Sequence, residues 1–271
     1  MVTAASGQPV LNVEDLERVY GDGPQAHVAI RGMSFTVQEG EFVTIVGPSG
    51  CGKTTLLKCI SGLIPVTSGE VRFSGERITA VPERMGFVFQ EYSRSLFPWL
   101  TVQKNVAFPL DDLPEDERRS RVGDSLAAVG LDRFADRYPS QLSGGMQQRV
   151  AIARALAYRP SVMLMDEPFG SVDAYTRAEL EDLILRVRDH YGMTIVLVTH
   201  DIDESVYLGD RILVLSGAPA RVVDTIAVAL PRERDQVHTP ELPAFIETRA
   251  RVARGIFGQQ KNPVPVNGGG E

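Results

Sequence analysis

The chain has 271 residues and a formal net charge of −7. This length suits one large α/β domain or two small ones, and an apolar share of 43% is ordinary for a packed core. The acidic balance gives no general attraction to nucleic acid or anionic lipid, so no nucleic-acid partner is expected. Apolar runs such as Ile195–Val198 fall far short of the ~20 residues that a membrane-spanning helix needs. Because Met1–Val10 lacks the features of a secretory signal, we expect a cytoplasmic chain that meets a membrane through another protein.

The chain begins with a predicted antiparallel layer and continues into a predicted parallel sheet. Leu11–Leu16 and Ser34–Val37 alternate in polarity around the turn at Gly21–Pro24, which indicates antiparallel strands. Farther along, short β-type runs alternate with helical stretches, as expected for a mostly parallel sheet covered by helices. These runs are Phe42–Val46, Met85–Phe89, Val162–Met165, Thr194–Thr199 and Ile212–Leu215. The runs at 162–165 and 194–199 are apolar throughout, which predicts central strands buried on both faces.

Strand signals stop between about residues 91 and 160, where we expect a helical subdomain. Pro114–Val129 carries acidic residues early and apolar residues later, as a helix would. The subdomain would lie within an α/β domain of residues 1–230. From Pro231 onward charge and proline content rise, which predicts a short C-terminal extension over 231–271. Its end, Asn262–Glu271, is rich in proline and glycine without periodicity and is expected to be disordered.

The strongest local motif fits GxxxxGK[ST] and lies between the predicted strand Phe42–Val46 and a helix-like run, Thr55–Ile60. Its glycines let the backbone fold around phosphate oxygens, and the following helix N-terminus favours negative charge. Lys53 would bring positive charge to the β- and γ-phosphates, and Thr54 would offer a hydroxyl to Mg²⁺. The alternative is a glycine-rich turn without a ligand. The motif predicts nucleotide contacts from Gly47, Pro48, Ser49, Gly50, Cys51, Gly52, Lys53, Thr54 and Thr55.

The two cysteines, Cys51 and Cys59, match neither a zinc pair nor a CxxC motif, so we expect free thiols in a reducing compartment. Cys51 lies inside the predicted phosphate loop, where a small residue fills a tight turn. A second hypothesis is that alkylation of Cys51 blocks nucleotide entry.

Two acidic residues, Asp166 and Glu167, follow the buried run Val162–Met165, and Pro168 then ends the strand. They would lie at the carboxyl end of the strand, where ligands of open α/β sheets bind. Asp166 would hold Mg²⁺ through water, and Glu167 would act as the base that polarises the attacking water. An acidic pair of this kind can also be a solvated loop end, but the phosphate loop favours the catalytic interpretation.

A second candidate anion site is Leu142–Arg149, with the sequence LSGGMQQR. It begins a helical stretch that runs through Ala157, with Ser143 as N-cap and two glycines that leave backbone N–H groups accessible. An SGG sequence alone would indicate an ordinary capped helix. The whole octapeptide, placed between the phosphate loop and the acidic strand, is much more specific.

From about Tyr20 to Val223 the order of motifs resembles that of the ABC transporter ATPases, for which LSGGMQQR is the family signature. In that family the signature of one subunit faces the ATP held by the phosphate loop of the other. The resemblance therefore implies ATP and Mg²⁺ as ligands and a head-to-tail dimer with a second nucleotide-binding subunit. It implies that ATP on the second subunit is contacted by Ser143, Gly144, Gly145 and Gln147.

Further positions follow the family pattern. Tyr20 matches the aromatic residue that stacks on adenine, although a half-buried tyrosine before a turn is the alternative. Gln90 matches the glutamine that contacts Mg²⁺ and the attacking water and senses the transmembrane partner; alone it would be a solvated strand-end amide. His200 matches the histidine that contacts the γ-phosphate, whereas a lone histidine is usually structural. Ser171-Val172-Asp173 departs from the more usual SALD, but keeps its serine and aspartate, and is expected to contact the other subunit.

The segment Ser95–Val102 holds the single tryptophan of the chain, and its apolar content suggests a docking patch or core packing. It is similar to importers of the nitrate, sulfonate and taurine group, as are the segments Asp166–Gly170, Asp173-Ala174, His200–Glu204 and Pro231–Asp235. This resemblance implies permease subunits as partners at the cytoplasmic face of the membrane, with a solute-binding protein acting indirectly. The tail after about residue 231 is too short for the regulatory domain of sugar importers.

Two other classes of protein are alternatives to a transport ATPase. A soluble ABC ATPase that acts on ribosomes or DNA is one alternative, but such translation factors carry two cassettes and the DNA-repair relatives carry long coiled coils. Neither pattern occurs in this sequence. A P-loop kinase of small molecules would leave the signature, Gln90 and His200 without explanation. The sequence therefore favours a transport ATPase and does not indicate its cargo.

Overall fold

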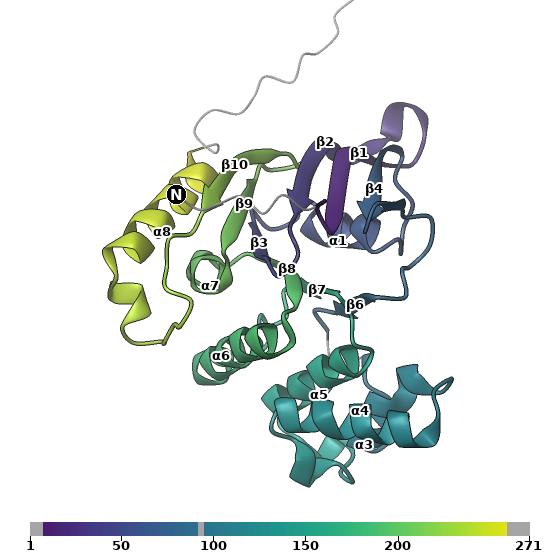
Figure 1. The fold of residues 1–271 in the computed structure, drawn as a ribbon. Coiled ribbons are helices and arrows are strands. Elements are labelled where there is room, and N and C mark those ends of the chain that lie inside the picture. The colour runs from purple at the N-terminus through teal and green to yellow at the C-terminus, as the bar shows by residue number, and fades with distance from the viewer. Residues whose placement is uncertain (1–7, 92–94, 259–271) are drawn as a thin grey trace, which may run out of the picture.

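The computed structural model describes residues 8–91 and 95–258. Two β-sheets, the helices packed beside them and a separate group of helices make up this part of the chain (Figure 1). Asn262–Glu271, which the sequence predicts to be disordered, lies outside the described residues. Across 8–91 and 95–258, no helix combines the length and the apolar character that crossing a membrane requires.

A six-stranded sheet with the order β10-β9-β3-β8-β7-β6 forms the centre of the structure. Its strands are β3 (Phe42–Val46), β6 (Met85–Val88), β7 (Val162–Asp166), β8 (Thr194–Thr199), β9 (Arg211–Leu215) and β10 (Val222–Ala227). Neighbouring strands are parallel, except that β10 is antiparallel to β9. The mostly parallel sheet predicted from the sequence is confirmed, and its strands β3, β6, β7, β8 and β9 end at one common edge.

The central strands are apolar because helices or a second sheet cover both of their faces. Every residue of β7 and β8 is buried. Along β7, Val162 and Leu164 pack into the apolar cluster shared with the antiparallel sheet, whereas Met163 and Met165 pack into the cluster shared with the helices. A strand buried on both faces needs apolar side chains at successive positions.

The antiparallel sheet has the order β2-β1-β4-β5. Its strands are β1 (Leu11–Tyr20), β2 (His27–Val37), β4 (Ser68–Phe73) and β5 (Glu76–Arg77), and a 3₁₀ turn, η1 (Gly23–Gln25), joins the first two. The predicted layer is confirmed, but β1 is longer than its alternating pattern indicated. Register shifts interrupt the alternation between Val13 and Leu16, and Asp15 has a φ of 45°. At this bulge a Cβ on Gly69 would lie 2.3 Å from the backbone oxygen of Asp15, which explains the glycine.

A group of helices follows β6 in the chain and forms a separate lobe in Figure 1. It comprises α3 (Val102–Ala107), α4 (Glu115–Ala128) and α5 (Gly144–Ala157), with 3₁₀ turns at η2 (Phe108–Leu110), η3 (Asp132–Phe134) and η4 (Pro139–Gln141). The helix expected within Pro114–Val129 is confirmed as α4. Its first turn is acidic, which stabilises the positive end of the helix dipole, while Val122 and Leu126 are buried in the core.

The remaining helices are α1 (Lys53–Ile60), α6 (Ala174–Tyr191), α7 (Ile202–Leu208) and α8 (Pro243–Phe257), with a 3₁₀ turn at η5 (Thr239–Glu241). Helix α8 was not predicted from the sequence. Its buried residues Phe245, Val252 and Ile256 form a narrow stripe that joins the core, and Arg251 pairs with Asp224 on β10 at 2.7 Å. The charged residues and prolines around this stripe obscured its apolar periodicity in the sequence. A domain boundary at residue 230 stays a prediction.

Asn105, buried on α3, fixes the backbone before this helix. Its Oδ1 accepts the N–H of Phe97, and its Nδ2 lies 3.1 Å from the carbonyl oxygens of Phe97, Leu100 and Thr101. Asn105→Ala should lower the free energy of unfolding by roughly 2–3 kcal/mol, because buried polar groups lose their partner. Urea denaturation measures the change, with Lys104→Ala, an exposed position on the same helix, as the control. Equal effects of the two substitutions would contradict this prediction.

Candidate functional site

The predicted phosphate loop, residues 47–54, connects β3 to α1 at the carboxyl edge of the sheet. Gly50 and Gly52 have φ values of 74° and 111°, a region that L side chains rarely adopt. A Cβ on Gly52 would also lie 3.0 Å from the backbone oxygen of Ala29. The turn itself contains Gly47, Pro48, Ser49, Gly50, Cys51 and Gly52, whereas Lys53, Thr54 and Thr55 begin α1. A tight glycine turn that leads into a helix N-terminus suits a phosphate group.

Lys53 places a positive charge inside this loop. Its side chain is 4% exposed, and its Nζ donates to the carbonyl oxygens of Gly47 at 3.0 Å and Pro48 at 3.2 Å. The same nitrogen lies 3.5 Å from Oε1 of Glu167. The ammonium group is therefore fixed at the loop by oxygen atoms, in a position to balance the charge of a phosphate.

The strand order brings the other predicted catalytic residues to Glu167. Gln90 follows β6, Glu167 follows β7 and His200 follows β8. Because these three strands are neighbours and parallel, their carboxyl ends lie together. Oε2 of Glu167 lies 3.2 Å from Nε2 of Gln90 and 3.0 Å from Nδ1 of His200. Three residues that are distant in sequence, Lys53, Gln90 and His200, thus contact the carboxylate of Glu167.

Glu167 adopts a backbone conformation that is unusual for a residue with a side chain. Its φ is 41°, in the left-handed region. The conformation is held by hydrogen bonds on both sides, from the Glu167 N–H to the oxygen of Val198 at 2.9 Å and from the N–H of Gly170 to the oxygen of Glu167 at 3.2 Å. Strained residues of this kind concentrate at functional sites, where the surrounding structure fixes the side chain.

Asp166 and Thr54 offer oxygen ligands suited to Mg²⁺. Oγ1 of Thr54 donates to Oδ1 of Asp166 at 3.0 Å, which joins the phosphate loop to the end of β7. Burial raises the pKa of the Asp166 carboxyl against the opposing effect of the Thr54 hydrogen bond, and a bound cation would favour the ionised form. No group of three or more His, Cys, Asp or Glu in the described part of the chain could hold a metal by itself. Mg²⁺ commonly takes few protein ligands and completes its shell with water and phosphate oxygens, so Thr54, Asp166 and Gln90 fit this ion.

The signature residues belong to α5, in the helical lobe. Ser143 is the N-cap of α5, and its Oγ accepts the N–H of Met146 at 3.3 Å. Nε2 of Gln147 donates to the oxygens of Pro139 at 3.1 Å and Leu142 at 3.3 Å, so this side chain is held within its own chain. Figure 1 shows α5 in the helical lobe and α1 beside the antiparallel sheet. One chain therefore does not bring its signature to its own phosphate loop, and contact of these residues with a second nucleotide stays a prediction.

Gly145 of the signature touches the start of α6. A Cβ on Gly145 would lie 2.3 Å from Cγ2 of Thr176. Thr176 in turn donates its backbone N–H and its hydroxyl to the carboxylate of Asp173, the N-cap of α6. The signature helix and the segment Ser171-Val172-Asp173 are therefore linked within one chain.

Tyr20 lies at the end of β1 with 39% of its surface exposed. The guanidinium carbon of Arg18 lies 4.5 Å from the centre of its ring, a cation–π contact. An aromatic ring that is partly exposed can receive a second planar group, and stacking on adenine stays a prediction.

Cys51 is 1% exposed within the loop. Burial raises the pKa of its thiol, and the charge of Lys53 opposes this shift without cancelling it. The thiolate is the reactive form of cysteine, so a buried and protonated thiol reacts slowly. This environment argues against the hypothesis that alkylation of Cys51 blocks nucleotide entry.

Asp201 and Arg177 are two residues near the site whose individual roles were not predicted from the sequence. Oδ1 of Asp201 accepts the N–H groups of Asp203 at 2.9 Å and Glu204 at 3.2 Å, so it caps α7 directly after His200. Its Oδ2 pairs with Nη1 of Arg177 on α6 at 3.0 Å. An aspartate before acidic residues and an apolar run is a helix-start signal that could have indicated the cap. No local pattern indicates the pairing with Arg177.

Gly145→Ala should destabilise the protein, because the added methyl group would overlap the Thr176 side chain. Overpacking of this kind costs about 1–3 kcal/mol. Adding Thr176→Ser removes Cγ2 but keeps the hydroxyl that bonds Asp173, so the double variant should recover much of the loss. Chemical denaturation of the parent, both single variants and the double variant measures this coupling. Purely additive effects of the two substitutions would contradict the contact.

Known proteins that resemble this chain identify its family. A family model described as ABC transporter matches residues 30–170. The aliphatic sulfonates import ATP-binding protein SsuB of Bacillus cereus is 41% identical over 242 residues, which cover 89% of this chain and 94% of SsuB. The bicarbonate transport ATP-binding protein CmpC of Synechococcus elongatus is 42% identical over 262 residues, which cover 94% of this chain. This chain spans 39% of the length of CmpC.

Solved structures of ATP-binding cassettes share the fold. The cassette MJ0796, in a dimeric post-hydrolysis state bound to ADP and Pi, has a TM-score of 0.70 at 35% identity, covering 80% of this chain and 98% of that one. CbiO1 of Clostridium perfringens, part of the ABC transporter complex cbiONQ, has a TM-score of 0.75 at 29% identity, covering 95% of this chain and 97% of that one. This chain therefore belongs to the ATP-binding cassettes of the ABC transporter family.

Proposed function

We propose that this chain is the ATP-hydrolysing subunit of an ABC membrane importer. The observation that carries the proposal is the position of Glu167, whose carboxylate meets Lys53, Gln90 and His200 beside the phosphate loop. A carboxylate so placed can accept a proton from the water that attacks the γ-phosphorus. The names of the relatives SsuB and CmpC, an importer and a transport protein respectively, support the transport role.

The residues of the site divide the proposed reaction among them. The phosphate loop and Lys53 bind the triphosphate, and the charge of Lys53 balances negative charge on its oxygens. Glu167 accepts a proton from water as the oxygen of that water bonds to the γ-phosphorus. The bond from the γ-phosphorus to the β–γ bridging oxygen breaks, which gives ADP and inorganic phosphate. Gln90 and His200 orient Glu167 through their hydrogen bonds, and Mg²⁺, when held near Thr54 and Asp166, supplies further positive charge.

A second nucleotide-binding subunit, identical or related, would complete each site. Ser143, Gly144, Gly145 and Gln147 of one subunit would face the ATP bound to the loop of the other. The separation of α5 from α1 in Figure 1 supports this arrangement, as does the dimeric state of MJ0796. In such a dimer, Tyr20 would stack on the adenine bound by its own subunit.

An aromatic patch, formed by the exposed rings of Trp99 and Phe108 and the half-buried ring of Phe97, is the proposed docking site for a permease subunit. Trp99 is 70% exposed, and its ring centre lies 5.6 Å from that of Phe97, which is 4.4 Å from that of Phe108. Aromatic residues of this kind often dominate binding energy at interfaces. Docking here would hold the subunit at the cytoplasmic face of the membrane, with a solute-binding protein acting indirectly. The cargo would be a small solute such as nitrate, a sulfonate, taurine or bicarbonate.

Glu167→Gln keeps the size of the side chain but removes the base. We expect ATP hydrolysis to fall about 10²–10⁴-fold while ATP binding persists, because general-base catalysis supplies a factor of that order. ATP with Mg²⁺ should then hold the variant as a dimer, which light scattering detects, and phosphate release measures turnover. Lys53→Ala serves as the control that loses nucleotide binding. A Glu167→Gln protein that stays monomeric with ATP and Mg²⁺, yet hydrolyses at the parent rate, would refute the assignment.

Trp99→Ala removes the exposed ring of the docking patch. The isolated variant should hydrolyse ATP as the parent does, but should no longer co-purify with a polytopic membrane protein, since loss of an aromatic hot spot costs ~2 kcal/mol or more of binding. Tyr191→Ala, at an exposed aromatic residue on α6, is the matched control. Undiminished membrane association of Trp99→Ala would exclude the patch. Stable association of the parent with ribosomes would exclude the transport role.

A further inference from the structure

Helices α6 and α7 both begin beside the candidate site. The N-cap of α6 is Asp173, next to Gly145 of the signature through Thr176, and the N-cap of α7 is Asp201, which follows His200 directly. The two helix starts are joined by the ion pair between Arg177 and Asp201. The relative position of α6 and α7 therefore influences where His200 lies beside Glu167.

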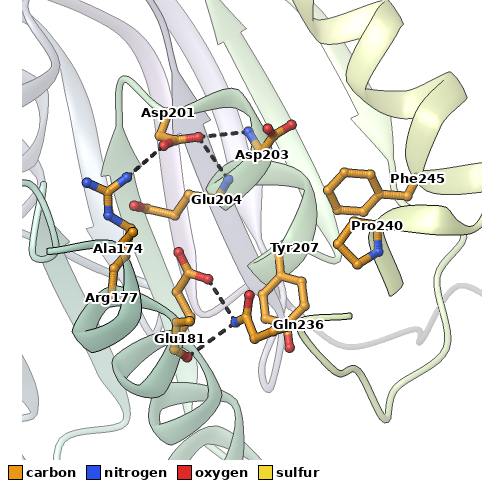
Figure 2. Close-up of a pocket in the computed structure, with 11 residues that line it drawn as sticks. Ala174, Arg177, Glu181, Asp201, Asp203, Glu204, Tyr207, Gln236, Pro240 and Phe245 are labelled. Atoms are coloured by element: carbon orange, nitrogen blue, oxygen red, sulfur yellow. Dashed lines mark hydrogen bonds and ion pairs between the residues drawn. The ribbon is translucent and has the colours of Figure 1, made fainter. Parts of the chain in front are cut away.

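A cavity of about 200 Å³ lies between these helices, and Arg177 and Asp201 are among the residues that line it (Figure 2). Glu181 of α6 and Glu204 of α7 both line it, and they are 6% and 5% exposed. Oε1 of Glu204 has no hydrogen-bond partner among the described residues. Burial raises the pKa of Glu181 to about 7 and holds the pKa of Glu204 well above its ordinary value. Helices α6 and α7 thus face each other across two buried carboxyl groups.

The C-terminal segment 231–257 spans both helices at this cavity. Nε2 of Gln236 lies 3.0 Å from Oε2 of Glu181, 3.1 Å from Oδ1 of Asp182 and 3.2 Å from the backbone oxygen of Ala178, all on α6. Figure 2 shows Gln236 directed at Glu181, with Pro240 and Phe245 on the side of α8. Two residues earlier, the Arg234 guanidinium donates to the backbone oxygens of Tyr207 and Gly209 at the end of α7. The segment therefore binds α6 through one side chain and α7 through another.

We propose that Gln236 is a positioning residue for ATP hydrolysis, which fixes α6 against α7 and so keeps Asp201 paired with Arg177 and His200 beside Glu167. The inference rests on the proposed function. The hydrogen bonds of Gln236 reach α6 and not the phosphate loop. Its effect would pass along α6, on which Glu181 lies four residues after Arg177, and from Arg177 to Asp201 through their ion pair. Its loss should lower the turnover number and leave the KM for ATP unchanged.

Glu181 provides a pH-dependent readout of this arrangement. The charged and titratable groups that face it across the cavity and from α6 are Arg177, Asp182, Asp201, Asp203, Glu204 and Tyr207, besides the amide of Gln236. Among these groups, Arg177 carries the positive charge. Once Glu181 is ionised it competes with Asp201 for Arg177, and it adds charge beside Asp182. We expect this competition to release Asp201 and to lower hydrolysis as the pH rises through about 7.

The first experiment compares Gln236→Ala with Arg251→Ala. Arg251 anchors the same C-terminal segment, but to Asp224 on β10 and away from α6. Gln236→Ala should reduce the turnover number about 3- to 10-fold at an unchanged KM, as expected when hydrogen bonds that orient the site are lost. Arg251→Ala should keep both constants. Thermal unfolding of both variants, measured on the same samples, separates a local effect from general destabilisation.

The second experiment compares the pH profiles of the parent and Glu181→Gln. The glutamine still accepts a hydrogen bond from Gln236 but cannot ionise, so the fall in turnover above about pH 7 should disappear. The inference is overturned if Gln236→Ala matches the parent or Arg251→Ala, or if Glu181→Gln keeps the parent's profile. Failure of the proposed function looks different, because the parent itself would then bind ATP without hydrolysing it.

Discussion

The contact of Glu167 with Lys53, Gln90 and His200 depends on four parallel strands that end at the same edge. β3 leads into the loop that holds Lys53, while β6, β7 and β8 lead into the other three residues. Reversing any one strand would carry its side chain to the opposite edge. A shift of β7 by one residue would exchange Val162 and Leu164 with Met163 and Met165 between its two packed faces, so the fit of these side chains holds the register. Core packing and the chemistry of the site are therefore set by the same strands.

Much of this arrangement could be predicted from the sequence, because its signals are local. The apolar runs at 162–165 and 194–199 predicted the central strands. The glycine pattern at 47–54 predicted the loop, in which Gly50 and Gly52 are left-handed. The acidic first turn indicated α4. That Gln90 and His200 lie near Glu167 then follows from the parallel topology. The distances between their side chains could not be predicted in this way.

What the sequence could not predict are contacts between distant segments and departures from a regular pattern. Thr176 faces Gly145, and Gln236 reaches α6, without any motif that joins the partners. The side chain of Gln147 bonds the backbone just before its own helix, an orientation that a motif does not specify. The bulge at Asp15 broke the alternation that marks β1, and the short apolar stripe of α8 was hidden by its charged neighbours. Each miss is a case in which tertiary packing decides the local structure.

The burial of both cysteines bears on how this protein responds to oxidative stress. Cys51 and Cys59 are at most 2% exposed, and burial raises the pKa of both thiols, to about 11 for Cys59. Peroxides and disulfides react with exposed thiolates, which neither residue provides. The phosphate loop thus contains a sulfur atom that is shielded from the redox state of its surroundings. The proposed hydrolysis of ATP would therefore continue under oxidants that inactivate enzymes with an exposed thiolate at the nucleotide site.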